Sequence, residues 1–181
     1  MLTIKNLKKS FNEGTENEVN IFNGFNLEIK ESEFVAILGS NGCGKSTLFN
    51  IISGSVQDNG GSIILGGTDI SALKEEERAG KIGKVHQDPS KGKFIELLKE
   101  LDLGLENKLN TQVKFLSGGQ RQALSLIMAT MKKPELLLLD EHTAALDPKT
   151  SRMIMSKTKQ LIDKQKITAM MISHNLRDAI K

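Results

Sequence analysis

Residues 39–47 read GSNGCGKST, and this stretch decides the fold. It fits the pattern G-x-x-x-x-G-K-[ST], follows an apolar run at residues 34–38 and opens a helical pattern at residues 45–52. Glycines let backbone N–H groups curl around phosphate oxygens, and the N-terminus of the following helix adds a partial positive charge. The stretch therefore predicts a phosphate-binding loop between a buried parallel strand and a helix.

Each residue of the loop is a predicted nucleotide contact. Lys45 would place its ammonium group on the β- and γ-phosphates, and the Ser46 hydroxyl is a predicted ligand of Mg²⁺. A chance glycine turn is the alternative, but a match of this kind arises in a chain of this length only about once in a hundred sequences. The predicted nucleotide-binding residues are Gly39, Ser40, Asn41, Gly42, Cys43, Gly44, Lys45, Ser46 and Thr47.

The rest of the chain alternates between short apolar runs and helical patterns, which is typical of an α/β domain with a mainly parallel sheet. Strands are expected at residues 2–7, 25–29, 34–38, 62–65, 136–139 and 167–172, with a weaker candidate at 81–86. Helices are expected at residues 45–52, 93–101, 118–131 and 148–163, and a further helix is expected to start after residue 174.

An acidic pair ends one of the expected strands. Residues 136–141 read LLLLDE, so a buried strand delivers Asp140 to the carboxyl edge of the sheet, where open α/β sheets bind their ligands. Asp140 would hold Mg²⁺ directly or through water, and Glu141 could polarise an attacking water molecule. A solvated strand end is the alternative, and the phosphate loop favours the functional interpretation.

Composition limits the functional classes. The formal net charge of +3 does not demand nucleic acid, and a chain with no Trp and no Tyr has little capacity for base stacking. A single cysteine forms no internal disulfide, which favours a reducing compartment. No apolar run approaches the roughly 18 residues that span a bilayer, so any membrane role is expected to come through a partner.

Residues 116–120 read LSGGQ and are followed by Arg121 and Gln122. The sequence resembles the ABC ATPases, whose signature is LSGGQ, and the resemblance covers essentially the whole chain. It implies a single domain over residues 1–181: a P-loop NTPase of the ABC type with an antiparallel β part near the N-terminus. The signature is also a Ser N-cap on a glycine-rich helix start, and this local reading agrees with a helix end that binds a γ-phosphate.

The resemblance assigns further roles residue by residue. Phe11 matches the aromatic residue that stacks on adenine, and Gln87 matches the loop glutamine that senses Mg²⁺ and the transmembrane partner. His174 matches the histidine that contacts the γ-phosphate and completes a catalytic set with Glu141 and Gln87, while Mg²⁺ is assigned to Ser46, Gln87 and Asp140. The loop that touches an opposite subunit matches Ala145, Leu146 and Asp147, and the residues that bind nucleotide in trans match Ser117, Gly118, Gly119 and Gln120.

The chain departs from the family in its middle. The stretch between Gln87 and Ser117 is short, so the helical subdomain, roughly residues 88–132, is expected to be reduced. The chain also ends soon after His174, and natural shortening, truncation and residues omitted from the sequence all remain open.

The resemblance implies an ATP-binding and ATP-hydrolysing subunit that powers solute transport. The residues around the signature and the acidic pair resemble those of importers. Its expected partners are a second ATPase subunit in a head-to-tail dimer, a transmembrane permease and a solute-binding protein, and no nucleic acid is expected. The expected location is cytoplasmic, on the inner face of the cell membrane. A non-transport ABC ATPase of translation or DNA repair and a regulatory nucleotide-binding protein are the alternatives.

Overall fold

The computed structural model describes residues 1–83, 91–131, 133–140, 143 and 146–173. The strands are β1 (Leu2–Phe11), β2 (Val19–Ile29), β3 (Phe34–Ile37), β4 (Gly60–Leu65), β5 (Thr68–Asp69), β6 (Ile82–Gly83), β7 (Leu136–Asp140) and β8 (Thr168–Ile172). The helices are α1 (Lys45–Ser53), α2 (Glu75–Arg78), α3 (Lys91–Glu100), α4 (Gly118–Thr130) and α5 (Pro148–Gln165), with 3₁₀ turns η1 (Leu105–Asn107) and η2 (Val113–Phe115).

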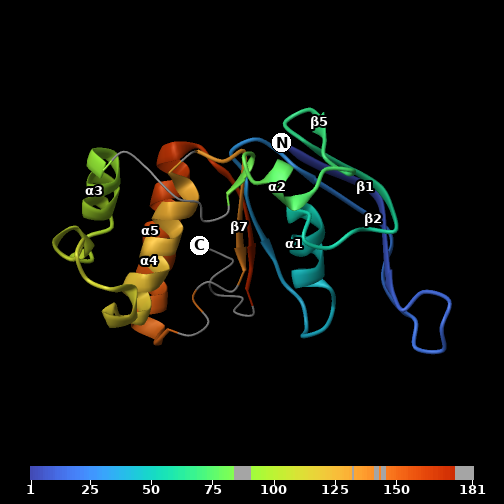
Figure 1. Cartoon of the computed structure of the whole chain (residues 1–181), viewed down its shortest axis with the longest axis horizontal. Coiled ribbons are helices and arrows are strands. Elements are labelled where there is room, and N and C mark those ends of the chain that lie inside the picture. Colours follow the sequence, from blue (N-terminus) through green and yellow to red (C-terminus); the bar gives the residue numbers. More distant parts are fainter. Residues whose placement is uncertain (84–90, 132, 141–142, 144–145, 174–181) are drawn as a thin grey trace.

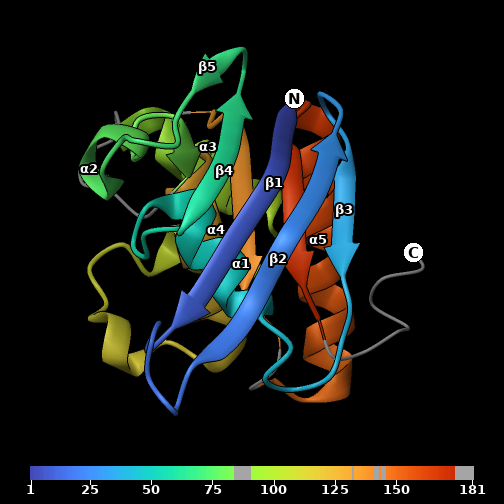
Figure 2. The same ribbon diagram turned by 90° about the vertical axis from the view of Figure 1, so that its right-hand side faces the viewer.

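The first sheet is antiparallel and has the strand order β2-β1-β4-β5. Its central strand β1 pairs along its length with β2, from Leu2 opposite Ile29 to Phe11 opposite Val19. Figure 2 looks onto this sheet and shows α1 behind it. The sheet confirms the antiparallel part expected near the N-terminus and shows that β4 and β5 extend it.

The second sheet is parallel and has the order β3-β8-β7-β6. Successive residues of β7 and β8 point to opposite faces, because side chains alternate along a strand. Leu137 and Ala169 accordingly belong to the core on the α4 and α5 side, whereas Leu136 and Met170 belong to the core around α1. A sheet that is apolar on both faces is the expected form of a parallel sheet covered on both sides.

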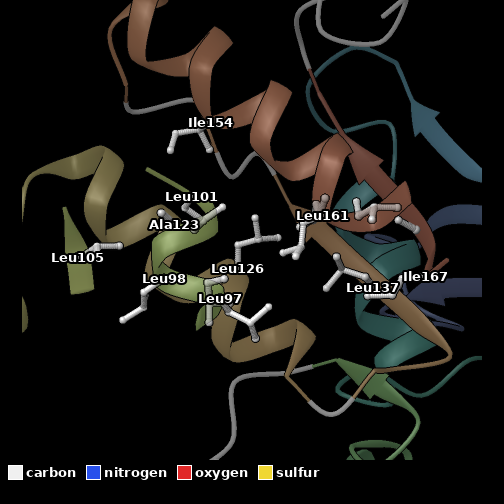
Figure 3. Packing of buried hydrophobic residues seen from close by; sticks show 14 of the residues in the cluster. Leu97, Leu98, Leu101, Leu105, Ala123, Leu126, Leu137, Ile154, Leu161 and Ile167 are labelled. Atoms are coloured by element: carbon white, nitrogen blue, oxygen red, sulfur yellow. The ribbon is translucent and has the colours of Figure 1, made fainter. Parts of the chain in front are cut away.

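The molecule is therefore layered around the parallel sheet. Figure 1 shows α1 and the antiparallel sheet on one side of β7, and α3, α4 and α5 on the other. Figure 3 shows the packing on the helical side, where Leu97 and Leu98 of α3, and Leu101 just after it, lie close to Ala123 and Leu126 of α4. Within the described part of the chain, no helix has both the length and the apolar character needed to cross a membrane.

The observed elements confirm most of the expected ones and extend several. β1 and β2 are longer than expected, and β5 and α2 were not expected at all. The weak strand candidate at residues 81–86 contains β6, and the rest of that candidate lies outside the described residues, as does the helix expected after residue 174.

Candidate nucleotide-binding and hydrolysis site

The phosphate loop joins the end of β3 to the start of α1, as the sequence predicts. Residues 39–43 of the loop are exposed, whereas the side chain of Lys45 folds inward and only 8% of the residue is accessible. Its Nζ atom lies 2.8 Å from the carbonyl oxygens of both Gly39 and Ser40 and donates a hydrogen bond to each. The ammonium group thus sits within the curl of its own loop, where a phosphate would compete for it.

Gly44 fits the loop to the sheet beneath it. Its φ angle is +96°, a conformation that side chains other than glycine rarely adopt. A Cβ atom at this position would lie 2.6 Å from Ile21 Cγ2 and 3.2 Å from Phe22 Cζ, both on β2. The carbonyl of Gly44 also accepts the Leu48 N–H at 2.8 Å, which starts the helix. Glycine at this position sets both the turn and the approach of the loop to the antiparallel sheet.

Asp140 lies at the same sheet edge as the phosphate loop. In the parallel sheet, Ile172 of β8 is in register with Asp140 on one side and with Ile37 on the other. Neighbouring strands lie about 4.8 Å apart, so Asp140 is about 10 Å from the strand end that enters the loop. An exposed carboxylate on one strand and the exposed Ser46 hydroxyl on α1 are hard oxygen donors of the kind that Mg²⁺ prefers.

Phe11 stands at the end of β1, on the antiparallel sheet. Its ring is partly exposed, and Lys9 Nζ lies 4.8 Å from the ring centroid in a cation–π contact. An accessible ring face at the end of this strand is compatible with the base-stacking role that the resemblance implies. That role stays a prediction.

The signature forms the first turn of α4. Ser117 is the N-cap: its Oγ accepts the Gln120 N–H at 3.2 Å, and Gln120 Oε1 accepts the Ser117 N–H at 3.1 Å. This reciprocal pair is a capping box, so the predicted N-cap is confirmed. Gly118 and Gly119 allow close packing, because Cβ atoms there would lie 2.9 Å from Leu146 Cδ2 and 2.7 Å from Thr150 Cγ2.

The two motifs do not face each other within one molecule. α1 packs in the core between the two sheets, and α4 packs in the helical core on the opposite face of the parallel sheet. Figure 1 shows the two helices on opposite sides of β7. The signature and the phosphate loop are therefore presented as separate surfaces.

Asp147 caps α5 in this structure. Its Oδ1 accepts the N–H groups of Lys149 and Thr150 at 3.1 and 3.0 Å. Hydrogen bonds from Thr150, its side chain first and then its backbone, lower the pKa of Asp147, and the Lys149 N–H adds to the effect. This capping role was not anticipated from the sequence, although an acid followed by Pro148 at the first helical position is a recognisable signal.

Gln87, Glu141, His174 and Ala145 lie outside the described residues. Asp140 and Ser173, which precede Glu141 and His174, are both described, and the Ser173 N–H donates to the Ile37 carbonyl at 3.3 Å. The chain therefore reaches the sheet edge that carries the phosphate loop immediately before each of these two predicted catalytic residues.

Two further cations were missed by sequence reasoning. Lys108 Nζ donates to Gln120 Oε1 at 3.1 Å, although Lys108 follows η1 and Gln120 belongs to α4. Arg78 is buried at 4% exposure, and its guanidinium donates to the carbonyl oxygens of Ile51 and Ile52 at 2.7 and 2.9 Å, at the end of α1. Both contacts depend on the tertiary fold, and neither residue belongs to a motif.

The fold and the two motifs define an ATP-binding cassette, and comparison with known proteins agrees. The model of the ABC transporter family matches residues 22–144. The tyrosine transport ATP-binding protein of Clostridioides difficile is 41% identical over 213 residues, an alignment that covers 100% of this chain and 85% of the relative. A spermidine/putrescine import ATP-binding protein, PotA of Mannheimia succiniciproducens, is 33% identical, and the alignment covers 99% of this chain but 52% of the relative.

Solved structures give the same result. A dimeric ATP-binding cassette in a post-hydrolysis state, bound to ADP and Pi, superposes with a TM-score of 0.82 at 30% identity, covering 99% of this chain and 90% of that one. The matching proteins include both import and export systems.

The chain belongs to the ABC transporter family. It is an ATP-binding and ATP-hydrolysing cassette, as the phosphate loop and the signature predict. Its relatives are ATP-binding subunits of transporters, which favours the transport role over the non-transport and regulatory alternatives.

Proposed function

We propose that this chain powers the import of a small solute as one subunit of a head-to-tail dimer. The main support for this proposal is that the phosphate loop and the signature lie on opposite faces of the parallel sheet. One ATP would lie between Lys45 of one copy and the signature of the other.

In-line attack of water on the γ-phosphate depends mainly on positioning and electrostatics. Lys45 would exchange its bonds to the Gly39 and Ser40 carbonyls for charge-assisted bonds to phosphate oxygens. Glu141 would orient the attacking water, and His174 would support the γ-phosphate.

The donor set fits Mg²⁺, with Ser46 and Asp140 at the loop edge and Gln87 as the third predicted ligand. When bound, the ion supplies positive charge that offsets the charge developing on the phosphate oxygens. Ser46 stands at the start of α1, where the backbone N–H groups of the helix end point toward the same region.

The dimer and the catalytic residue are tested together with Glu141→Gln, which keeps the side-chain shape and removes the carboxylate. This variant should bind Mg-ATP, lose hydrolysis and accumulate as an ATP-dependent dimer in sedimentation velocity at high protein concentration. A Lys45→Ala/Glu141→Gln double variant is the control and should stay monomeric. Hydrolysis by Glu141→Gln at the parent rate would show that Glu141 is not the catalytic carboxylate.

The short middle of the chain is proposed to weaken dimerisation and turnover while leaving ATP binding intact. The alignment with the tyrosine transport relative spans 213 residues and the chain has 181, a difference of 32. The phosphate loop and Asp140 lie outside the Gln87-to-Ser117 stretch, whereas that stretch leads into the signature. Robust cooperative hydrolysis by the purified chain would contradict this proposal.

The remaining partners are proposed from the relatives. A transmembrane permease would receive the force of ATP binding, and the cassette would work at the cytoplasmic face of the membrane. Tyrosine is the first solute to test, since the tyrosine transport relative is the more similar of the two relatives described. Deleting the gene should abolish uptake of labelled tyrosine by cells, and a loss of efflux instead would assign the chain to export.

A further inference from the structure

Both polar atoms of the Gln120 side chain are hydrogen-bonded inside its own subunit. Its Oε1 accepts hydrogen bonds from the Ser117 N–H and from Lys108 Nζ, each at 3.1 Å. Its Nε2 donates to the carbonyl oxygen of Leu103, also at 3.1 Å. One amide therefore ties the first turn of α4 to the segment between α3 and α4.

Lys108 is the charged member of this arrangement. It directly follows η1, and its own N–H donates to the Leu105 carbonyl at 2.9 Å, which fixes its backbone. The residue is half-buried, and its ammonium group approaches an amide oxygen. A hydrogen bond from a charged donor is stronger than a neutral one, so Lys108 limits the orientation of the Gln120 amide.

The orientation of that amide matters because the same oxygen caps Ser117. If Gln120 Oε1 moved, the Ser117 N–H would lose its acceptor, and the capping box at the start of α4 would open. On the other side of the turn, Gly118 and Gly119 lie close to Leu146 and Thr150, which restricts movement toward α5. The signature turn is thus restrained on both sides, and the hydrogen bond from Lys108 restrains it on the side of η1.

We propose that Lys108 is a positioning residue for ATP hydrolysis in trans: by fixing Gln120, it holds Ser117 and the signature turn in the geometry that a second copy's ATP requires. This role rests on the proposed dimer. It predicts a division of effects, because the phosphate loop of the same chain lies on the other face of the parallel sheet. Replacing Lys108 should leave ATP binding at the chain's own phosphate loop unchanged. It should weaken ATP-dependent dimerisation and hydrolysis, which need the signature of the second copy.

Lys114 offers a matched control. It is exposed, close to the signature in sequence, and its Nζ lies 5.0 Å from the Phe115 ring centroid without a role in holding Gln120. Replacing either lysine by methionine removes one positive charge from the same part of the chain. A general electrostatic attraction for ATP would make the two variants alike, whereas a positioning role makes them differ.

The experiment compares Lys108→Met, Lys108→Arg and Lys114→Met. Each is measured for affinity toward a non-hydrolysable ATP analogue and for steady-state hydrolysis, and then, with Glu141→Gln added, for ATP-dependent dimerisation. Lys108→Met should keep its affinity in cis within about twofold and lose about tenfold in dimerisation and kcat, the scale of one charged hydrogen bond. Lys108→Arg should recover most of the loss, and Lys114→Met should match the parent.

A second measurement tests the route through Gln120. If Lys108 acts by holding that amide, the Lys108→Met/Gln120→Leu double variant should lose no more dimerisation than Gln120→Leu alone. Additive losses would overturn the proposal, as would equal effects of Lys108→Met and Lys114→Met. If Lys108→Met unfolds, Lys108→Gln, which keeps a polar side chain, replaces it in the same double-mutant cycle.

The outcomes separate the two proposals. If the Glu141→Gln parent stays monomeric with Mg-ATP at every concentration, the proposed dimer is wrong and the role of Lys108 in trans falls with it. If that parent dimerises and Lys108→Met dimerises equally well, the dimer stands and only the role of Lys108 is overturned.

Discussion

Two glycines of the phosphate loop allow strain and steric clash to be separated at the residue scale. Gly42 and Gly44 both have positive φ angles, +80° and +96°. A Cβ atom at position 42 would meet nothing within 4 Å, whereas one at position 44 would collide with Ile21 on β2. The stability cost of alanine at position 42 therefore comes from backbone strain alone, and the cost at position 44 comes from strain together with overpacking.

Gly42→Ala should lower the free energy of unfolding by about 1 kcal/mol, the cost of a left-handed conformation for a residue with a Cβ. Gly44→Ala should cost at least about 2 kcal/mol, since overpacking adds roughly 1–3 kcal/mol. Urea unfolding of both variants measures the difference. Equal costs would mean that the loop does not pack on β2 as described.

The roles of residues in a sequence motif can be predicted well, whereas the roles of residues in tertiary contacts can be predicted only poorly. The Ser117 cap and the Lys45 loop follow from local order in the chain. Lys108 was missed because nothing in its neighbours distinguishes it from a solvated lysine. Its partner Gln120 comes close only when η1 folds back against α4. Tertiary hydrogen bonds of this kind leave no periodic signal.

At the scale of elements, Arg78 connects α1 to the segment after β5. Besides the carbonyls of Ile51 and Ile52, its guanidinium donates to those of Ser71 and Leu73 at 2.9 and 2.8 Å. Burial lowers the pKa of Arg78, and the charges of nearby Asp58 and Asp69 oppose that shift. A cation at the C-terminal end of α1 also complements the helix dipole.

Arg78→Met should lower the free energy of unfolding by about 3 kcal/mol or more, because buried carbonyl groups lose their donor. Lys81→Met is a suitable control: its exposed ion pair with Glu135 should contribute no more than about 1 kcal/mol. Chemical denaturation measures both. An Arg78→Met variant as stable as Lys81→Met would show that the guanidinium does not hold the end of α1.

Asp147 makes the start of α5 sensitive to pH. Its pKa is lower in the folded chain than its ordinary value, so the carboxylate stabilises the fold above the unfolded pKa of about 3.9. That contribution is lost as the pH falls through the lower folded pKa. The stability difference between the parent and Asp147→Ala should therefore be full at pH 7 and shrink below about pH 4.

Asp147→Asn, which keeps a capping oxygen without a charge, is the control for the pH effect. Its stability relative to Asp147→Ala should not change over the same pH range. Thermal unfolding at a series of pH values gives both comparisons. A parent-to-alanine difference that is constant from pH 7 to pH 3 would exclude a carboxylate cap.

The elements found from the sequence and those missed differ in a physical way. α1, α4 and α5 combine a helical apolar pattern with a start signal, and β7 and β8 are short, continuous apolar runs. The first half of β2 mixes asparagine, glycine and apolar residues, and its pairing with β1 carries register shifts. That strand is stabilised by its neighbour rather than by its own pattern, so its full length could not be read from the sequence.

At the scale of the whole molecule, the parallel sheet separates the two motifs to which the sequence assigns functions. The side that carries α1 and the antiparallel sheet holds the phosphate loop, and the side that carries α3, α4 and α5 presents the signature. Because the proposed shortening lies between Gln87 and Ser117, outside the phosphate loop in the sequence, ATP binding by the phosphate loop should persist in the isolated chain. The two motifs predict the two functions from the sequence, but the placement of the motifs on opposite sides of the sheet required the structure.

Calorimetric titration of the whole chain with a non-hydrolysable ATP analogue and Mg²⁺ measures whether residues 39–47 bind nucleotide. The parent should bind nucleotide, and Lys45→Ala should bind it about 10- to 100-fold more weakly, since it loses a charge-assisted phosphate contact of about 1.5–3 kcal/mol. Lys114→Met, which removes the same charge elsewhere, should bind like the parent. A parent that does not bind, or a Lys45→Ala variant with unchanged affinity, would contradict the assignment of residues 39–47 as the nucleotide site.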